Sequence, residues 1–178
     1  IDFFFIPEEK IEVVYQGCNP IFQDKIAGNK QKETQEKYNL PNDYLLYVGS
    51  IEERKNLLTL LKALKELPNQ KLVVIGNGKR YKIKCLRFIA EHNLSDRVLF
   101  LSRLHLEEMA SIYQNAQILI YPSVFEGFGI SVIEAALCST PAIVTKGNNG
   151  VIESIEEGVS GFGITEKNHD DLAEKVSL

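Results

Sequence analysis

The sequence predicts an α/β domain built on a doubly wound parallel sheet. Short apolar runs recur along the chain, segments of helical periodicity separate them, and this alternation persists from residue 44 onward. The runs at 72–75, 98–101 and 118–120 contain apolar residues without interleaved polar ones, which is typical of parallel strands covered on both faces. Strands that alternate with helices favour one parallel sheet with helices packed on each side.

The expected strands are 11–15, 44–48, 71–75, 97–101, 117–121 and 142–145, with a weaker one at 161–164. The expected helices are 53–67, 81–91, 106–114, 130–138 and 151–157. In the first helix leucines recur at i, i+3, i+4, i+7 and i+10 from Leu57, the spacing of one helical face, and Pro68 ends the pattern. The polar stretch 24–42 is weakly periodic, so we expect a surface excursion with one marginal helix.

Composition narrows the class of protein. A length of 178 residues with 44% hydrophobic and 25% charged residues indicates one ordinary globular domain. The 20 Lys and Arg against 24 Asp and Glu give a net charge of −4, which argues against a nucleic-acid partner. No apolar run approaches the roughly 20 residues of a membrane helix. Three widely spaced cysteines leave an odd thiol in any disulfide scheme and predict a reducing, cytoplasmic location.

Ligands of open α/β sheets bind beyond the carboxyl ends of the strands, so we expect a ligand site in the loops that follow them. The loop after 44–48 begins with Gly49 and Ser50 and places Arg54 and Lys55 at the start of the predicted helix. Cations there oppose the helix dipole, at a cost of about 0.3–1 kcal/mol. Two adjacent cations therefore suggest an anionic ligand, although neutralisation by the two neighbouring glutamates is an equally weighted alternative.

The loop after 71–75 contains Gly76 and Gly78, which let the backbone approach a ligand closely. It lacks the third glycine of the G-x-G-x-x-G fingerprint, so a nicotinamide site is weakly supported. A tight turn without a ligand is the alternative for this loop.

Residues 122–138 form the most informative segment. The helix expected from Ile130 is apolar nearly all round, yet it carries Glu134 one turn inside its start. A buried carboxylate needs a partner, and helical side chains lean toward the N-terminus, where Glu126 and the free amides of 127–130 lie. We interpret this as a carboxylate pair around an anion site, against the alternative that Glu134 pairs with a neighbouring cation and Glu126 begins a turn.

A resemblance to family 4 glycosyltransferases, with their E-x7-E signature, is carried by Tyr121-Pro122-Ser123-x-x-Glu126-Gly127-Phe128-Gly129-x-x-x-x-Glu134-Ala135. These are retaining enzymes of the two-domain GT-B architecture. Further stretches follow in the family's order: Tyr47-Val48-Gly49, Lys55-Asn56, Ile75-Gly76-x-Gly78, Val98-x-Phe100-Leu101, Ile112-Tyr113-x-x-Ala116 and Thr140-Pro141-Ala142-Ile143. The resemblance spans about 11–163 and implies a Rossmann-like sheet, the C-terminal, donor-binding half of a GT-B fold.

The resemblance also implies the roles of individual residues. Glu126 faces the transferred sugar, Glu134 bonds the ribose hydroxyls, and Lys55 and Arg54 neutralise the departing diphosphate without a metal. Many family members have arginine where this chain has Ser50, so Arg54 is interpreted as the phosphate-binding arginine. The remaining expected donor contacts are Gly49, Ser50, Gly76, Gly78, Ser102, Leu104, Gly127, Phe128, Gly129 and Ile130.

By the same resemblance, residues 1–178 are one donor-binding domain, cut short in its last helix, with 1–10 as an interdomain linker remnant. The partners implied are a nucleoside diphosphate sugar, as substrate with no separate cofactor, and an acceptor-binding N-terminal domain outside this chain. Peripheral contact with the inner face of a membrane would occur through that missing domain. The alternatives are a nucleotide-sugar-binding module without transferase activity and a sugar-nucleotide 2-epimerase, with a dehydrogenase last.

Overall fold

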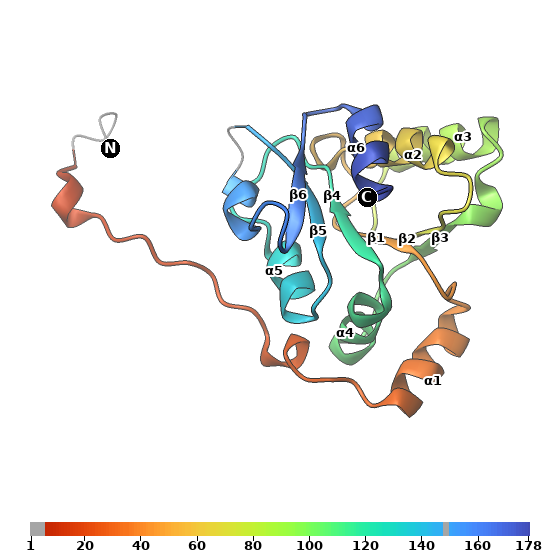
Figure 1. Cartoon of the computed structure of the whole chain (residues 1–178), viewed down its shortest axis with the longest axis horizontal. Helices are drawn as coiled ribbons and strands as arrows, with labels where there is room; N and C mark the ends of the chain where they lie inside the picture. Colours follow the sequence, from red (N-terminus) through yellow and green to blue (C-terminus); the bar gives the residue numbers. More distant parts are fainter. Residues whose placement is uncertain (1–5, 148–149) are drawn as a thin grey trace.

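The computed structural model of the chain describes residues 6–147 and 150–178, and in these the sheet has six parallel strands (Figure 1). The strands are β1 Leu45–Val48, β2 Leu72–Ile75, β3 Val98–Leu101, β4 Ile118–Tyr121, β5 Ala142–Thr145 and β6 Gly161–Ile164. Their order is β3-β2-β1-β4-β5-β6, and every neighbouring pair is parallel. The expected doubly wound parallel sheet is confirmed, including its weakest strand.

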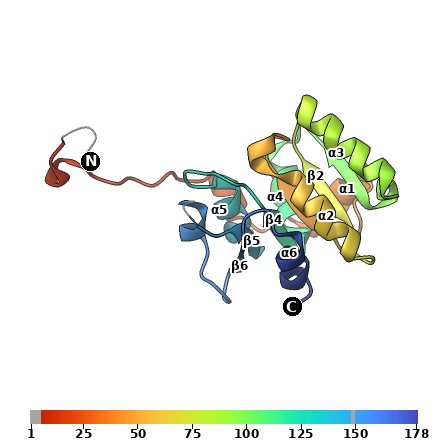
Figure 2. The same cartoon turned by 90° about the horizontal axis from the view of Figure 1, so that it is seen from above.

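Helices cover both faces of this sheet (Figures 1 and 2). Helices α4 (Leu106–Asn115) and α5 (Ile130–Leu137) lie on one face, with α1 (Gly28–Tyr38) packed on α4. Helices α2 (Leu57–Glu66), α3 (Arg80–Glu91) and α6 (His169–Val176) lie on the other. Within the described residues, no helix is both long enough and apolar enough to span a bilayer.

Successive strand residues point to opposite faces, so each strand contributes to two hydrophobic cores. In β1, Leu46 and Val48 belong to the core under α4 and α5, whereas Leu45 and Tyr47 belong to the core under α2 and α3. All four side chains are buried. This two-sided burial confirms the interpretation of the continuous apolar runs.

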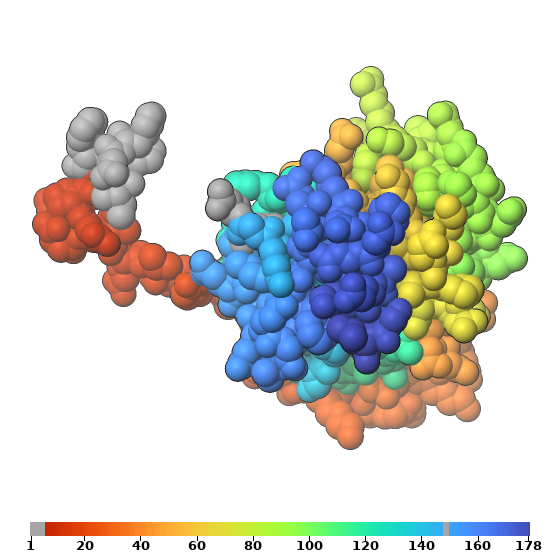
Figure 3. All heavy atoms as spheres, turned by 45° about the horizontal axis from the view of Figure 1, so that its top comes forward, coloured from red at the N-terminus to blue at the C-terminus, as the bar shows by residue number. Residues whose placement is uncertain are grey.

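The prediction of a strand at 11–15 is wrong. These residues are extended but pair with no strand in the described part of the chain, and Val13 and Val14 are 73% and 82% exposed. They form part of an arm that projects from the body of the molecule (Figure 3). Of the linker expected at 1–10, residues 1–5 lie outside the described range and the rest contain the 3₁₀ turn Glu8–Lys10. The helix expected at 151–157 is the shorter 3₁₀ helix Gly150–Ser154.

The polar segment 24–42 contains a well-formed helix rather than a marginal one. Helix α1 runs for 11 residues and is held to α4 by charged contacts that the local sequence does not reveal. Lys37 Nζ lies 2.6 Å from a carboxylate oxygen of Glu108, Tyr38 donates a hydrogen bond to the same carboxylate, and Lys30 pairs with Glu107. Most helical stability comes from tertiary packing, which explains why weak periodicity understated this helix.

Candidate active site

The candidate site lies where the winding of the sheet changes direction. Strands β1 and β4 are neighbours, but the chain proceeds from β1 to β2 on one side and from β4 to β5 on the other. At such a switch point the two following loops diverge and leave a crevice at the carboxyl edge. The loops in question are 49–56 after β1 and 122–129 after β4, the two that carry the predicted cations and the predicted carboxylate.

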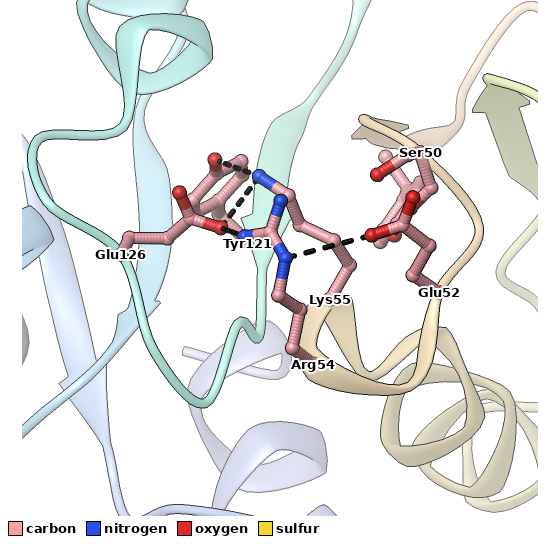
Figure 4. Close-up of polar contacts among 7 residues, drawn as sticks. Ser50, Glu52, Arg54, Lys55, Tyr121 and Glu126 are labelled. Carbon is pink, nitrogen blue, oxygen red and sulfur yellow. Dashed lines mark hydrogen bonds and ion pairs between the residues drawn. The ribbon is translucent and has the colours of Figure 1, made fainter.

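Glu126 joins these two loops electrostatically (Figure 4). Its Oε1 lies 2.5 Å from Lys55 Nζ and 2.8 Å from Arg54 Nη1, and Arg54 Nε lies 3.5 Å from a carboxylate oxygen of Glu52. The structure therefore brings together the three residues expected to be catalytic. The local alternative is also partly realised, because Glu52 shares the guanidinium of Arg54.

Lys55 occupies a protected position in this cluster. It is 9% exposed, and its ammonium donates a 2.7 Å hydrogen bond to the Tyr121 hydroxyl while lying 4.9 Å from the centroid of that ring. Burial raises the pKa of Tyr121, and the hydrogen bond from Lys55 acts in the opposite direction. Tyr121 therefore stays neutral at physiological pH and serves as an acceptor for the lysine. Arg54 differs, since its side chain is half exposed.

The backbone at the cations is not the first turn of a long helix, contrary to the expectation for 53–67. Residues Glu53–Lys55 form a separate 3₁₀ turn, and Asn56, with φ of 55°, interrupts the chain before α2 begins. The side-chain amide of Asn56 donates to the Pro122 carbonyl at 3.2 Å, and the backbone amide of Val124 donates to the Arg54 carbonyl at 2.8 Å. These bonds tie the two loops together, and they place the cations beside the α2 terminus rather than inside it.

The N-terminus of α5 faces the same crevice. Gly129 caps the helix with φ of 81°, and a Cβ at this position would lie 2.5 Å from Cγ2 of Val151, so glycine is required on two grounds. The first amides of a helix have no acceptor within it and carry the positive end of the dipole. The expected anion contacts Gly127, Phe128, Gly129 and Ile130 are therefore brought next to Glu126.

The loop that leads into α5 is supported from behind by the 3₁₀ helix Gly150–Ser154. The amide of Gly150 donates to the Glu126 carbonyl at 3.1 Å, and Ser154 Oγ donates to the Phe128 carbonyl at 3.0 Å. A Cβ on Gly150 would lie 2.0 Å from the carbonyl oxygen of Gly127, so this close approach requires a glycine. The backbone around Glu126 is thereby held in place on the side away from the cations.

Glu134 is half-buried in α5 and has a partner, as expected, but the partner is not a cation. The Tyr113 hydroxyl, from α4, donates a 2.9 Å hydrogen bond to Glu134 Oε2, and no described lysine or arginine forms an ion pair with it. Burial raises the pKa of Glu134, and the bond from Tyr113 opposes that rise. The alternative in which Glu134 pairs with a neighbouring cation is therefore not realised among the described residues, and its carboxylate is fixed between two helices.

The two glycines after β2 have a structural reason of their own. A Cβ on Gly76 would lie 1.9 Å from the Gly49 carbonyl oxygen, and a Cβ on Gly78 would lie 2.2 Å from the Ile51 carbonyl oxygen. The two loops are thus packed backbone to backbone, with the Ile51 amide donating to the Asn77 carbonyl at 2.8 Å. Beside them lies an open groove of about 610 Å³, lined by Ile51, Glu52, Glu53, Asn77, Gly78, Lys79, Arg80 and Tyr81.

Three other expected donor contacts lie on the same edge of the sheet. Ser50 follows Gly49, and its carbonyl accepts a 3.0 Å hydrogen bond from the Tyr47 hydroxyl. Ser102 and Leu104 follow β3, two strands away from β1, where Leu104 packs against the core. The expected loop residues therefore all lie at one edge of the sheet, with the tightest cluster at the switch point.

Two tyrosines of the site were missed as functional candidates. Tyr121 holds Lys55, and Tyr113 holds Glu134, yet both resemble ordinary buried aromatic residues in the sequence. The available signal for Tyr121 was its place as the last residue of an apolar strand, next to the loop with Glu126. Among residues 6–147 and 150–178, no group of three or more His, Cys, Asp or Glu side chains is placed to hold a metal ion.

The family profile and the similar proteins that match this chain are all glycosyltransferases. The profile described as "Glycosyl transferases group 1" matches residues 29–178. An uncharacterized glycosyltransferase of Methanocaldococcus jannaschii is 28% identical over 179 residues, covering 96% of this chain and 45% of the relative. The O-antigen chain mannosyltransferase RfbU of Salmonella typhimurium is 30% identical over 141 residues, covering 79% and 36%.

Solved structures show the same fold. The Anabaena protein Alr3699/HepE, in complex with UDP and glucose, superposes with a TM-score of 0.85 at 22% identity, covering 96% of this chain and 47% of that one. The chain thus spans less than half the length of each of these proteins. With a parallel α/β sheet, a cation–carboxylate cluster at its switch point and a profile match over most of its length, the chain belongs to the glycosyl transferases group 1 family.

Proposed function

We propose that this chain is the donor-binding domain of a retaining, family 4 glycosyltransferase that transfers a hexose from a nucleoside diphosphate sugar to an acceptor glycan or lipid-linked saccharide. The observation that carries the proposal is the convergence of Arg54, Lys55 and Glu126 beside the N-terminus of α5. The mannosyltransferase named among the relatives and the UDP and glucose bound by the structural neighbour support this donor class.

The proposed role of the cations is to stabilise negative charge on the leaving group. When the bond between the sugar C1 and the diphosphate oxygen breaks, negative charge grows on the leaving diphosphate. Two cations and the amides of a helix N-terminus can stabilise that charge without reorganising, because they are already held in place. In this role Lys55 supplies a buried ammonium, and Arg54 supplies a half-exposed guanidinium that can donate two parallel hydrogen bonds. The diphosphate sugar is the substrate of the reaction, and no separate cofactor is proposed.

Glu126 and Glu134 take different roles in this proposal. Glu126 contacts both cations in the structure, so a bound diphosphate would take over these contacts and the carboxylate would face the sugar. Glu134, fixed by Tyr113, would accept hydrogen bonds from the ribose hydroxyls. The base would lie near the loops after β2 and β3. Attack on the face from which the diphosphate departs would then retain the configuration at C1.

The acceptor belongs to a different part of the protein in this proposal. Because the chain spans under half of its relatives, transfer would take place between this domain and an N-terminal acceptor domain, and the chain alone would bind donor without turnover. Any peripheral contact that the N-terminal domain makes with the inner face of a membrane would bring the acceptor to the cleft. Domain boundaries of 1–178 and the linker at 1–10 remain predictions.

Calorimetric titration of the chain with UDP, GDP and ADP tests the proposal. We expect one nucleotide to bind and its affinity to fall at least tenfold in Glu134→Ala and in Lys55→Ala. The exposed α2 residues Lys65 and Glu66 provide matched alanine controls with the same changes of charge. A folded sample that binds none of the three nucleotides would overturn the donor-domain proposal.

The type of reaction needs the longer protein with donor and acceptor. Transfer to the acceptor with the configuration at C1 unchanged, followed by NMR of the product, is the expected result. Inversion at C2 without an acceptor would indicate a 2-epimerase instead, and binding with neither reaction would indicate a module that only binds. The comparisons favour neither alternative.

A further inference from the structure

Helix α3 carries basic residues that extend from the groove beside the donor site onto the solvent face. The helix carries Arg80, Lys82, Lys84 and Arg87 against the single acid Glu91, in a chain whose net charge is −4. Lys79 precedes the helix, and its first turn contains no acidic residue. Cations at this end oppose the helix dipole, so the arrangement is unfavourable unless an anion lies nearby.

Most of these cations have no carboxylate partner. Among the described residues, Lys79, Arg80, Lys82 and Arg87 form no ion pair within 4.0 Å, and Lys84 has only a 3.9 Å contact with the exposed Glu53. Helix α1 behaves differently, because its lysines are matched by glutamates of α4 and of its own next turn. The positive charge of α3 is therefore uncompensated locally.

Apolar side chains lie between these cations on the solvent side. Ile83 and Leu86 are 60% and 43% exposed, whereas Cys85 and Ile89 on the opposite side are buried in the core. With about 100° of rotation per residue, Ile83, Leu86 and Ala90 form one strip. By the same rotation, Lys82 lies on one side of the strip, and Arg80, Lys84 and Arg87 lie on the other. We call the face formed by these seven residues the basic strip. Six of them are exposed, and Lys82 is partly exposed, with its ammonium 5.1 Å from the centroid of the Phe100 ring.

The basic strip is also accessible. Helix α3 lies at the end of the molecule away from the N-terminal arm in both ribbon views, and its yellow-green atoms form the outer margin in the space-filling view (Figures 1, 2 and 3). Its first residues line the groove beside the donor site, together with Gly78. Of the strip, only Arg80 lines that groove, so a flat partner can contact the other six residues without entering it.

We propose that the basic strip of α3 binds the surface of an anionic lipid bilayer, with Ile83 and Leu86 entering the boundary between headgroups and acyl chains. This goes beyond the proposed function, since it assigns a membrane contact to this domain itself. Cations flanking a central apolar strip suit an interfacial helix, which gains from burying apolar area and from attraction to anionic lipids at the same time. A polyanion such as nucleic acid would use the charges but leave two apolar side chains without a role.

Co-sedimentation with vesicles tests the proposal. We expect the chain to bind vesicles of phosphatidylglycerol and phosphatidylcholine in equal parts, and to bind pure phosphatidylcholine at least tenfold more weakly. Arg80→Gln/Arg87→Gln should weaken binding about 25-fold, from roughly fivefold per cation near an anionic surface. The matched control is Lys62→Gln/Lys65→Gln on α2, which removes the same charge from exposed positions and should change binding less than twofold.

The apolar contribution has its own pair of variants. Ile83→Ser/Leu86→Ser keeps every charge and should weaken binding at least tenfold, whereas Leu106→Ser/Val159→Ser removes two exposed apolar side chains elsewhere and should not. Circular dichroism verifies that each variant is folded. Binding that survives Ile83→Ser/Leu86→Ser but not the arginine changes would make the strip a general polyanion site and overturn the bilayer proposal, as would no sedimentation with either vesicle. Because Arg80 lines the groove beside the donor site, nucleotide titrations are compared with Ile83→Ser/Leu86→Ser, whose residues lie outside that groove and should leave nucleotide affinity unchanged.

Discussion

Replacing Lys55 with methionine separates its contribution to the stability of the fold from its contribution to diphosphate binding. The variant keeps the length of the side chain and loses the charge. The ammonium contacts Glu126 at 2.5 Å and Tyr121 at 2.7 Å, and the side chains of Lys55 and Glu126 are only 11% and 12% exposed. Hydrogen bonds to charged groups contribute about 1.5–3 kcal/mol, and an unpaired buried charge costs about 3–5 kcal/mol. Arg54 stays 2.8 Å from the same carboxylate oxygen, so the lower range applies.

We therefore expect Lys55→Met to lower the free energy of unfolding by about 2 kcal/mol, which is about 4–8 °C in Tm for a domain of this size. Arg54→Met is the matched control, since its side chain is 51% exposed and such pairs contribute about 0–1 kcal/mol. Both variants should weaken binding of inorganic pyrophosphate about tenfold, corresponding to one lost charge-assisted contact each.

Urea unfolding followed by circular dichroism measures the first quantity, and calorimetric titration with pyrophosphate measures the second. Equal destabilisation by the two variants would refute the argument from burial. A Lys55→Met chain that is destabilised but binds pyrophosphate as tightly as the unchanged chain would refute the assignment of Lys55 to the diphosphate and leave it a purely structural role.

Two further predictions concern the carboxylates. Glu126→Gln removes the charge that neutralises both cations, so pyrophosphate should bind about tenfold more tightly in the same titration, and weaker binding would contradict the exchange of contacts. Burial raises the pKa of Glu134, so the folded chain takes up this proton more readily than the unfolded chain, and the associated stability is lost as pH rises through the folded pKa. Glu134→Gln, which keeps an acceptor for Tyr113, should therefore raise the free energy of unfolding at pH 7 by less than about 1 kcal/mol, because the group is half-buried. That gain should vanish at pH 4 in a series of thermal unfolding measurements, and a gain independent of pH would contradict the role of burial.

The strands from β1 onward could be predicted from the sequence because buried parallel strands have a local sequence pattern, a short apolar run between turn residues. The strand at 11–15 was predicted from a run of β-branched and aromatic residues that includes Glu12, and this prediction is wrong, since a strand needs a neighbour and the described chain offers none. Helix α1 was predicted to be only marginal because the contacts that stabilise it are not local. Its stabilising partners, Glu107 and Glu108, lie about seventy positions away in α4, beyond the reach of any periodicity.

The local sequence by itself determined the residue types and the edge of the sheet at which they gather. Arg54 and Lys55 follow one strand and Glu126 follows another, and parallel strands bring their carboxyl ends to one edge. Which of these loops touch depends on strand order, a property of the whole chain, and only the tertiary structure shows that β1 and β4 are neighbours. The same holds for Tyr121 and Tyr113, because a hydrogen bond between residues tens of positions apart leaves no pattern in either local segment.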